Sequence, residues 1–393
     1  MSSIASREGA STLDEMVVRI EARTCVFPLP GPFLLGRRRI EHREYVVVTV
    51  TDSSGVKGNA FGLSRGAPIE SIVTAMLGPL FIGSNIADPG AVSIDVGERL
   101  QPHATEGLVG RAMSLIDIAL WDILGQHLRQ PVGELLGARR RSAPAMVVEG
   151  YPKAAEDDAM FVDRLLGRVD EGYKFLKVAW GATDPGAFTD RLSLLMRHLP
   201  QGVAVAVDAA WGWQDEKVAS RQLKDWALFD LAWIEDPVPA DDLKALRRMR
   251  EGSGLRFGVG DEVARVRTLL EVATSGTVDV LRVDVTCAGG FSRFAEIAAT
   301  AEKSNLMVST HVYPELHVHA ALGATHEGPV EFFPPKSPWD TAWEFVSPVE
   351  PTMQAGIRVF ESPTSVGLGL QLDWSRIEAT TATSSFCEKK GRT

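Results

Sequence analysis

Three acidic side chains recur at nearly equal intervals, and each follows a short apolar run. Asp208, Glu235 and Asp261 are 27 and 26 residues apart. A strand and its returning helix need about this much chain, so the interval predicts consecutive βα units of a parallel barrel, whose strand ends converge on one mouth. Carboxylates gathered there would repel one another unless a hard divalent cation neutralised them, and an all-oxygen set suits Mg²⁺ better than Zn²⁺. The interval therefore predicts a magnesium site; a helix N-cap or a solvated loop charge is the alternative for each acid taken alone.

Composition limits the classes of partner. The chain has 393 residues, 45% of them hydrophobic and 23% charged, which is enough to bury a barrel and a second domain. Its net charge is −10 and its 41 basic residues form no long tract, so neither nucleic acid nor an anionic membrane is expected as a main partner. There is no apolar stretch of transmembrane length and no basic-then-apolar leader, and Cys25, Cys287 and Cys387 form no CxxC pattern. We expect a cytoplasmic protein in a reducing compartment.

The apolar pattern changes along the chain. Residues 16–63 alternate apolar and polar side chains, which predicts antiparallel strands, whereas about 68–130 has helical spacing. Residues 1–140 are therefore expected to form an α+β domain, and residues 141–350 the barrel. A helix over 155–170, ended by Gly172, should follow the first barrel strand. The eight barrel strands are expected at AMVVEG (145–150), YKFLKVAW (173–180), VAVAVD (203–208), LAWIED (231–236), LRFGVGDE (255–262), VDVLRVDV (278–285), LMVSTHVY (306–313) and GPVEFF (328–333).

After residue 350 the βα pattern stops. IRVFESP (357–363) and GLGLQLDW (367–374) are expected to pack back on the first domain. The polar residues from about 380 are expected to form a frayed tail. The segment 351–393 is thus expected to return to the first domain.

Four motifs carry a resemblance to a known family. The helix and loop SLIDIALWDILGQHLRQPVGELLG (114–137) and the strand ends IEDP (234–237), GDE (260–262) and DVTCAGG (284–290) resemble the mandelate racemase and muconate lactonising branch of the enolase superfamily. The resemblance runs over nearly the whole chain, in order. It implies an α/β fold: a modified TIM (β/α)7β barrel with an N-terminal α+β capping domain that the C-terminal segment completes.

The resemblance also implies a metal centre. Asp208, Glu235 and Asp261 would ligate an essential Mg²⁺, with Asp261 preferred over Glu262 because the ligand in similar sequences follows the position of Gly260. The metal would bind the carboxylate of a small-molecule substrate. Removing a proton next to a carboxylate creates a dianionic enediolate, which a divalent cation and ammonium groups stabilise.

A base must take that proton, and enolase-type sites use Lys or His. Asp284 and His311 end consecutive predicted strands and match the Asp/His dyad of the mandelate racemase group. The carboxylate would fix the imidazole tautomer and raise its basicity. A structural or surface histidine is the alternative.

The family carries Lys-x-Lys at the end of the second barrel strand, and this chain departs from that motif. Lys177 is present, either as a site residue or as a lysine reaching solvent, but Ala179 replaces the second lysine, which is the usual base for the opposite face. Ala210 likewise replaces an asparagine two residues after Asp208. Racemisation normally needs a proton carrier on each face, whereas one histidine can serve as base and acid in a syn elimination.

The departures therefore favour β-elimination of water from an acid sugar, an aldonate or aldarate, to give a 2-keto-3-deoxy acid. A racemase, epimerase or cycloisomerase that uses an unrecognised second group is the first alternative. A catalytically decayed metal-binding homologue is the second. Relatives usually assemble as dimers or octamers, so a homo-oligomer is expected.

Further residues are candidates for substrate contact. Glu331 would hydrogen-bond the enediolate or protonate a leaving group, unless it is only a strand-end charge. The loops 27–39 and 61–68 would form a mobile lid, and the basic cluster of Arg37, Arg38, Arg39, His42 and Arg43 is interpreted as a solvated loop in preference to a carboxylate-binding lid. The pocket candidates are Arg65, Trp180, Tyr313 and Glu315; for the last three, apolar wall or a helix start is the alternative.

Overall fold

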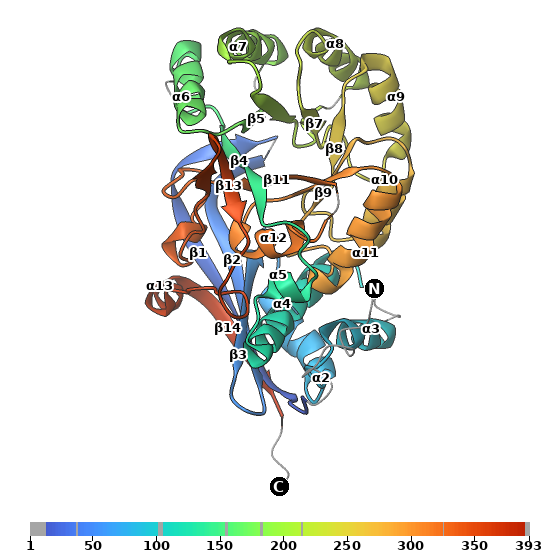
Figure 1. Ribbon diagram of the computed structural model, residues 1–393, viewed down its shortest axis with the longest axis vertical. Helices are drawn as coiled ribbons and strands as arrows, with labels where there is room; N and C mark the ends of the chain where they lie inside the picture. The colour runs from blue at the N-terminus through green and yellow to red at the C-terminus, as the bar shows by residue number, and fades with distance from the viewer. Residues whose placement is uncertain are drawn as a thin grey trace.

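The computed structural model describes residues 13–36, 38–100, 105–153, 156–180, 184–213, 215–324 and 326–389. They form a parallel barrel and an α+β cap (Figure 1). The order of elements along the chain is cap, barrel and cap again, because the last strand returns to the sheet in which the first begins. None of the helices within these ranges is long and apolar enough to cross a membrane.

Eight parallel strands close into the barrel, and β11 pairs with β4 to complete the ring. In the described part of the barrel, seven helices connect the strands and lie around the outside (Figure 1), so the predicted (β/α)7β barrel is confirmed. The strands are β4 (Ser142–Gly150), β5 (Phe175–Ala179), β6 (Ala204–Asp208), β7 (Trp233–Glu235), β8 (Phe257–Val259), β9 (Val280–Val283), β10 (Met307–Thr310) and β11 (Glu327–Phe332). The helices are α6 (Asp158–Asp170), α7 (Pro185–His198), α8 (Glu216–Trp226), α9 (Leu243–Ser253), α10 (Val266–Thr274), α11 (Gly290–Lys303) and α12 (Pro314–Ala321).

The barrel strands are short apolar runs because both of their faces are covered, one by the helices and one by the packed interior. Met146, Ala206, Trp233 and Val280 fill that interior as one buried cluster. The predicted helix over 155–170 begins at Asp158, and its expected first residue lies outside the described ranges.

The cap consists of one antiparallel sheet and a set of helices. The sheet order is β14-β1-β2-β3, and the long helix α4 packs against β2 and β3. The strands are β1 (Val17–Leu35), β2 (Arg38–Asp52), β3 (Lys57–Leu63) and β14 (Thr381–Glu388). The helical elements are α1 (Ile69–Ser71), the π-helix η3 (Ile72–Leu77), α2 (Gly78–Phe81), α3 (Pro89–Arg99), α4 (Leu108–Leu128) and α5 (Val132–Leu135).

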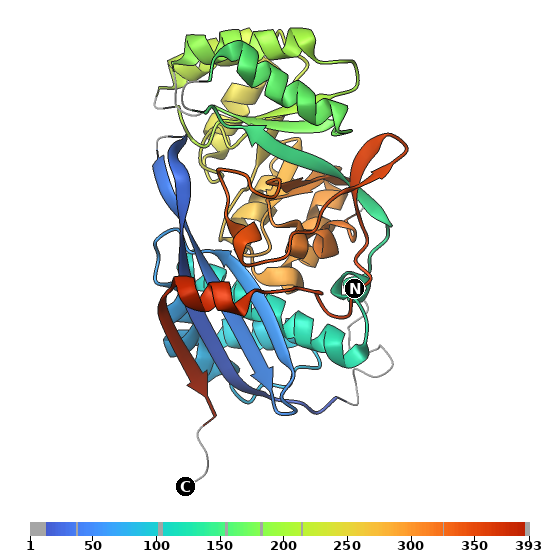
Figure 2. The same cartoon turned by 90° about the vertical axis from the view of Figure 1, so that its left-hand side faces the viewer.

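The segment 27–39 is not the irregular loop that we expected. It belongs to a hairpin in which the pairing of β1 with β2 is interrupted between Pro28 and Phe33 and resumes as far as Leu35 and Arg38. The hairpin extends from the cap to the barrel (Figure 2). At its tip, Gly36 has φ +55°, and a Cβ there would overlap the carbonyl oxygen of Ala210. The hairpin can therefore approach the barrel mouth this closely because the tip residue has no side chain. Arg37 lies outside the described residues.

The C-terminal segment corrects two further expectations. IRVFESP was expected on the first domain, but β13 (Ile357–Glu361) pairs with the barrel strand β4, and β12 (Thr352–Gln354) completes a hairpin with β13. The following residues do reach the cap, since the Leu368 N–H donates to the Asp122 carboxylate. The 3-10 turn Ala342–Glu344 precedes these strands, and α13 (Trp374–Thr380) leads to β14.

The expectation of a frayed tail from about residue 380 is wrong. Residues 381–388 form β14, which pairs antiparallel with β1 from Arg19 to Cys25 (Figure 2). Backbone pairing does not require an apolar sequence. The polar sequence of residues 381–388 therefore gave no sign of a strand. It covers the edge of β1, which would otherwise be open to association with other chains.

Truncation tests the contribution of β14. A chain ending at Thr380 should unfold at least about 2 °C below the full chain, because its β1 edge loses a complete set of backbone partners. Thermal unfolding followed by circular dichroism measures the change. A chain ending at Lys389 is the matched control and should unfold with the full chain; equal midpoints for both truncations would show that β14 contributes nothing.

Candidate active site

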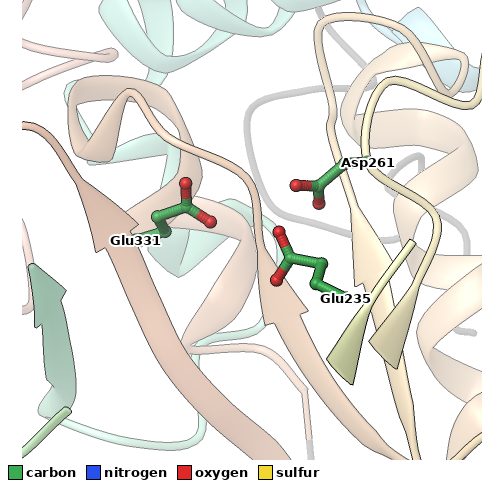
Figure 3. Close-up of side chains that lie close together, drawn as sticks. All are labelled: Glu235, Asp261 and Glu331. Carbon is green, nitrogen blue, oxygen red and sulfur yellow. The ribbon is translucent and has the colours of Figure 1, made fainter. Parts of the chain in front are cut away.

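Four carboxylates and two cations meet inside the barrel mouth. Asp208, Glu235 and Asp261 lie at or just after the ends of β6, β7 and β8, and Glu331 lies on β11. Glu235, Asp261 and Glu331 turn their carboxylates toward one another (Figure 3), with ligand-capable atoms that all lie within 4.8 Å. The sequence spacing therefore predicted two members of this trio, Glu235 and Asp261. Glu331 was predicted as a contact of the substrate.

Lys177 on β5 contacts all four carboxylates. Its Nζ touches Glu235 and lies 3.4 Å from Asp208 Oδ2, 3.3 Å from Asp261 Oδ2 and 3.0 Å from Glu331 Oε1. Burial alone would lower the pKa of Lys177, but the charges of Glu235, Asp208 and Asp261 raise it. Lys177 is therefore a buried ammonium ion of the site and not a lysine reaching solvent.

The second cation, Arg282 on β9, was missed by the sequence analysis. It is fully buried; its Nε lies 2.9 Å from Asp261 Oδ1 and 3.1 Å from Glu235 Oε2, and its Nη2 donates to Glu331. An arginine within the apolar run VDVLRVDV was the available signal, because a charge in a strand that is buried on both faces needs a partner. Both oxygens of Glu331 are thus engaged by Lys177 or Arg282, which favours an electrostatic role for Glu331 over protonation of a leaving group.

The cluster fits a divalent cation. When the four carboxylates are ionised, Lys177 and Arg282 leave two negative charges without a counterion. Burial raises the pKa of Glu235 to about 7, and the Arg282 charge opposes the shift only in part. Glu235 Oε1 is buried and, apart from its contact with Lys177 Nζ, has no hydrogen-bond partner in the described residues. An all-oxygen donor set with excess negative charge is the chemistry that Mg²⁺ prefers.

The acids of the cluster are not helix caps. Other aspartates cap the barrel helices: Asp215 accepts the Lys217 N–H at the start of α8, and Asp242 accepts the Ala245 N–H at the start of α9. Asp208 instead accepts the Ala210 N–H with Oδ1 and turns Oδ2 toward Lys177. The capping alternative is therefore excluded for Asp208.

Asp261 and Glu262 point to different partners. Asp261 belongs to the carboxylate cluster, whereas Glu262 pairs with Arg65 and Arg111 of the cap. Burial would raise the pKa of Glu262, but the Arg65 guanidinium lowers it well below its usual range. The geometry thus agrees with the preference for Asp261 in the cluster and gives Glu262 a different task, which is to hold the cap on the barrel.

Asp284 and His311 form the predicted pair. His311 Nδ1 lies 3.0 Å from Asp284 Oδ2, and His311 lines the cavity while Asp284 lies behind it. Asp284 Oδ1 also accepts the Thr286 N–H at 2.8 Å and the Thr286 hydroxyl at 2.6 Å. Burial opposes ionisation of Asp284, but its hydrogen bond with His311 lowers the pKa well below the usual value. An ionised Asp284 holds the proton on His311 Nδ1, so that Nε2, which lies 3.9 Å from Asp261 Oδ2, is the nitrogen that can act as a base.

His317 supports this pair from behind. Its Nε2 accepts the Val285 N–H at 2.9 Å, and its Nδ1 lies 3.2 Å from the Tyr313 carbonyl oxygen, to which it can donate. These two bonds connect the strand end that carries Asp284 to the start of α12. His317 was missed because nothing in its local sequence distinguishes it from a surface histidine.

A cavity of about 270 Å³ lies between the cluster, the dyad and the cap. Its walls contain an unusual number of side-chain-bearing residues with positive φ, a conformation that is strained and is found where surrounding structure enforces it. Val312 has φ +37° although it is β-branched, and Tyr313 has φ +45°. The other lining residues of this kind are Arg65, Ala210, Trp211, Asp236 and Glu262.

The four pocket candidates divide evenly. Tyr313 and Arg65 line the cavity. Trp180 does not; it packs against Trp213 with ring centroids 5.1 Å apart. Glu315 is also outside the lining, and its carboxylate accepts the Val349 N–H. The prediction that Trp180 and Glu315 contact the substrate is therefore wrong, and both side chains have structural roles.

The face of the cavity at Ala179 is apolar. Ala179 belongs to a buried cluster with Phe33, Ile40, Val148, Tyr151 and Trp339, so the hairpin of the cap covers the position of the missing second lysine. The Tyr151 side chain reaches the cavity from this cluster. Cations do lie against the rim of this cluster: the Arg43 guanidinium is 5.3 Å from the ring centroid of Phe33, and Lys153 Nζ is 5.4 Å from that of Trp339.

A closed parallel barrel whose strand ends gather carboxylates, a buried lysine and an Asp–His pair under an α+β cap defines an enolase-type enzyme. Two family models match the chain. The model of the mandelate racemase / muconate lactonizing enzyme N-terminal domain matches residues 19–137, and the model of the enolase C-terminal domain-like family matches residues 160–376. The chain belongs to the mandelate racemase and muconate lactonizing enzyme family of the enolase superfamily.

Known relatives differ in their reactions. The 3,6-anhydro-alpha-L-galactonate cycloisomerase of Streptomyces coelicolor is 28% identical over 289 residues, which cover 72% of this chain and 78% of the relative. The L-talarate/galactarate dehydratase of Salmonella typhimurium is 24% identical over 356 residues, 88% of this chain and 86% of the relative. The crystal structure of L-talarate dehydratase from Polaromonas sp. JS666, complexed with Mg and L-glucarate, has a TM-score of 0.81 at 23% identity and covers 96% of this chain and 100% of that one.

Replacing Glu315 tests its buried role. Burial raises its pKa to about 7, only partly offset by the Val349 N–H. An unfolded glutamate titrates near pH ~4.3, so the folded state holds the proton longer and loses stability as the pH rises from about 4.5 to about 7. Glu315→Gln cannot ionise, and its stability relative to the parent should improve by roughly 2–3 kcal/mol between pH 4.5 and pH 8.

Thermal unfolding across this pH range measures the difference. The exposed Glu350→Gln variant is the control and should follow the parent at every pH. If Glu315→Gln also follows the parent, Glu315 does not carry a raised pKa in the folded protein.

Proposed function

We propose that the protein is a Mg²⁺-dependent dehydratase of an acid sugar that produces a 2-keto-3-deoxy acid. The observation that carries the proposal is the asymmetry of the cavity. His311 with Asp284 offers one proton carrier, whereas the opposite face at Ala179 is an apolar cluster. A single carrier suffices when the proton leaves and the hydroxyl is protonated on the same face of the substrate.

The protein groups divide the work as follows. His311 Nε2 takes the proton from the carbon next to the substrate carboxylate, and the electron pair of that C–H bond forms the enediolate. The C–O bond at the neighbouring carbon then breaks, and His311 returns its proton to the departing hydroxyl, which leaves as water. The resulting enol becomes the 2-keto acid by tautomerisation. Lys177 supplies positive charge where the enediolate develops, and Asp284 keeps His311 in the reactive tautomer.

The carboxylate cluster would hold the metal, with Asp208, Glu235 and Asp261 as ligands. A bound Mg²⁺ would stabilise the enediolate by its charge. Support comes from the excess negative charge of the cluster and from the talarate dehydratase neighbour, which was crystallised with Mg. Asp208 is preferred over Glu331 because Lys177 is the sole cation in contact with Asp208 in the described ranges, whereas Lys177 and Arg282 both bind Glu331.

A cycloisomerase is the second candidate. The Streptomyces relative acts on an anhydro acid sugar, as its name states. If the leaving oxygen belongs to a ring of the substrate, the same proton removal opens that ring and releases no water. The two candidates therefore differ in the substrate and not in the base.

A substrate screen tests the proposed reaction. Aldonic and aldaric acids are incubated with enzyme and Mg²⁺, and semicarbazide detects 2-keto products. His311→Asn should lower turnover of the best substrate by roughly 10³-fold or more, since it removes the general base, while calorimetry should show unchanged Mg²⁺ binding. His198→Asn, on the exposed side of α7, is the matched control and should keep full activity.

The alternatives leave different traces. Exchange of the α-proton with D₂O without a keto product would favour a racemase or epimerase, and a keto product from an anhydro sugar alone would favour the cycloisomerase. If no acid reacts or exchanges, and His311→Asn changes nothing, the protein is a metal-binding homologue and the mechanism fails.

Metal titration tests the ligand set. Asp208→Asn should weaken Mg²⁺ binding by at least about 10-fold, because it removes a charged oxygen ligand. Glu331→Gln should weaken it less, because Arg282 and Lys177 already occupy that carboxylate. Isothermal titration calorimetry in Mg²⁺-free buffer gives both values, and the reverse order would assign Glu331 as the ligand in place of Asp208.

A further inference from the structure

Four arginines line the cavity, and two of them are already neutralised. Arg65 binds both oxygens of Glu262, and Arg111 donates to the same carboxylate and to the Leu63 carbonyl oxygen. Arg65, one of the predicted substrate contacts, is therefore already paired with a carboxylate of the protein. Arg38 lines the cavity from the hairpin and is exposed.

Arg43 differs from the other three because it is buried without a counterion. The residue is 4% exposed, and its Nε donates to the Trp339 carbonyl oxygen at 2.8 Å. Its Nη1 is buried; within the described ranges this nitrogen has no hydrogen-bond partner, and no carboxylate forms an ion pair with Arg43. The interpretation of the basic cluster as solvated thus suits Arg38, Arg39 and His42, which are exposed, but is wrong for Arg43.

The guanidinium of Arg43 is held in place by aromatic rings. It lies 5.3 Å from the ring centroid of Phe33 on β1 and 5.9 Å from that of Phe333, which follows β11. These contacts and the bond to Trp339 fix the group from the cap and from the barrel, so it cannot turn out to solvent without breaking them. Arg43 is therefore a positioned cation at the cap end of the cavity.

Within the described residues, no neighbouring acid forms an ion pair with this cation. Asp340, whose charge lies close enough to act with Arg43 on Tyr45 and Tyr313, uses Oδ1 to accept the Tyr45 hydroxyl and Oδ2 to accept the Ala342 N–H. Burying an unpaired guanidinium is costly, whereas pairing it with a carboxylate gives two parallel charge-assisted bonds. The cavity thus receives carboxylates from the barrel strands and an unpaired guanidinium from the cap strand β2.

We propose that Arg43 binds a second carboxylate of the substrate, so that the substrate class is a dicarboxylic acid sugar, an aldarate, and not an aldonate. This inference rests on the proposed function for the position of the reacting carboxylate, which lies at the cluster end. An aldonate ends in a neutral hydroxymethyl group, which can accept a hydrogen bond but leaves the charge of Arg43 unbalanced. An aldarate of the same configuration differs from it at this terminal carbon alone.

Binding to a catalytically silenced protein separates this inference from the reaction. His311→Asn with Mg²⁺ is titrated calorimetrically with matched pairs of probes: galactarate and galactonate, and glucarate and gluconate. At least one aldarate should bind at least about 30-fold more tightly than its aldonate, as expected for a fixed guanidinium pairing with a carboxylate.

Substitution of Arg43 then identifies the group responsible. Adding Arg43→Met, which keeps an unbranched apolar stem but removes the guanidinium, should remove the preference and change the aldonate affinity by less than about 3-fold. Arg43→Lys should keep part of it, because the charge remains but the paired geometry is lost. Arg39→Met is the matched control, since this arginine lies on the same strand, is exposed and pairs with Glu41; it should keep the full preference. Thermal unfolding checks that each variant is folded.

The outcomes distinguish the two proposals. Equal affinity for aldarates and aldonates, no binding of any aldarate, or a preference that survives Arg43→Met in a folded variant overturns the role of Arg43, even if the parent enzyme dehydrates an aldonate. A preference that depends on Arg43 supports the subsite, and if the parent enzyme then converts no acid, the failure belongs to the proposed dehydration.

Discussion

The structure depends on holding four carboxylates together inside the barrel mouth. Like charges at this separation repel strongly where water is excluded, so the arrangement needs counterions at fixed positions. Lys177 and Arg282 provide them from β5 and β9, and in doing so they connect these strands to β6, β7, β8 and β11. The negative charge that remains is what makes the site suited to a divalent cation. The same electrostatic constraint therefore organises both the barrel end and the proposed chemistry.

The cap completes the site with three kinds of contact. Glu262 joins the barrel to Arg65 and Arg111, Gly36 lets the hairpin reach Ala210, and Phe33 packs beside Ala179. The two departures from the family motif therefore lie where the hairpin touches the barrel. A lysine at position 179 would add a second positive charge beside Phe33, whose ring already faces the Arg43 guanidinium, and an unpaired buried charge is costly. The small side chain of Ala179 is therefore compatible with the close approach of the hairpin, whereas a lysine there would not be.

Residues at strand ends were predictable, whereas residues defined by distant partners were not. Asp208, Glu235, Asp261, Asp284 and His311 share one signal, a polar residue at the end of a short apolar run, and parallel strands bring such positions together. Arg65 could not be assigned correctly because its partner Glu262 lies 197 residues away. Trp180 follows a strand but turns to Trp213, outside the cavity. β14 has no apolar pattern, and its partners lie far away in sequence: the backbone of β1, and Glu70 and Thr74, which contact Ser385.

The sequence by itself determined the barrel, the order of its strands and the set of acids at their ends, because strand length, strand spacing and the positions of charges are local properties of the chain. Tertiary structure alone decided which charges are free to act. It neutralised Arg65 and Arg111 with Glu262, engaged Glu331 with Lys177 and Arg282, and left Arg43 buried without a counterion. Pairing depends on which groups meet after folding, and those groups come from segments that are far apart along the chain.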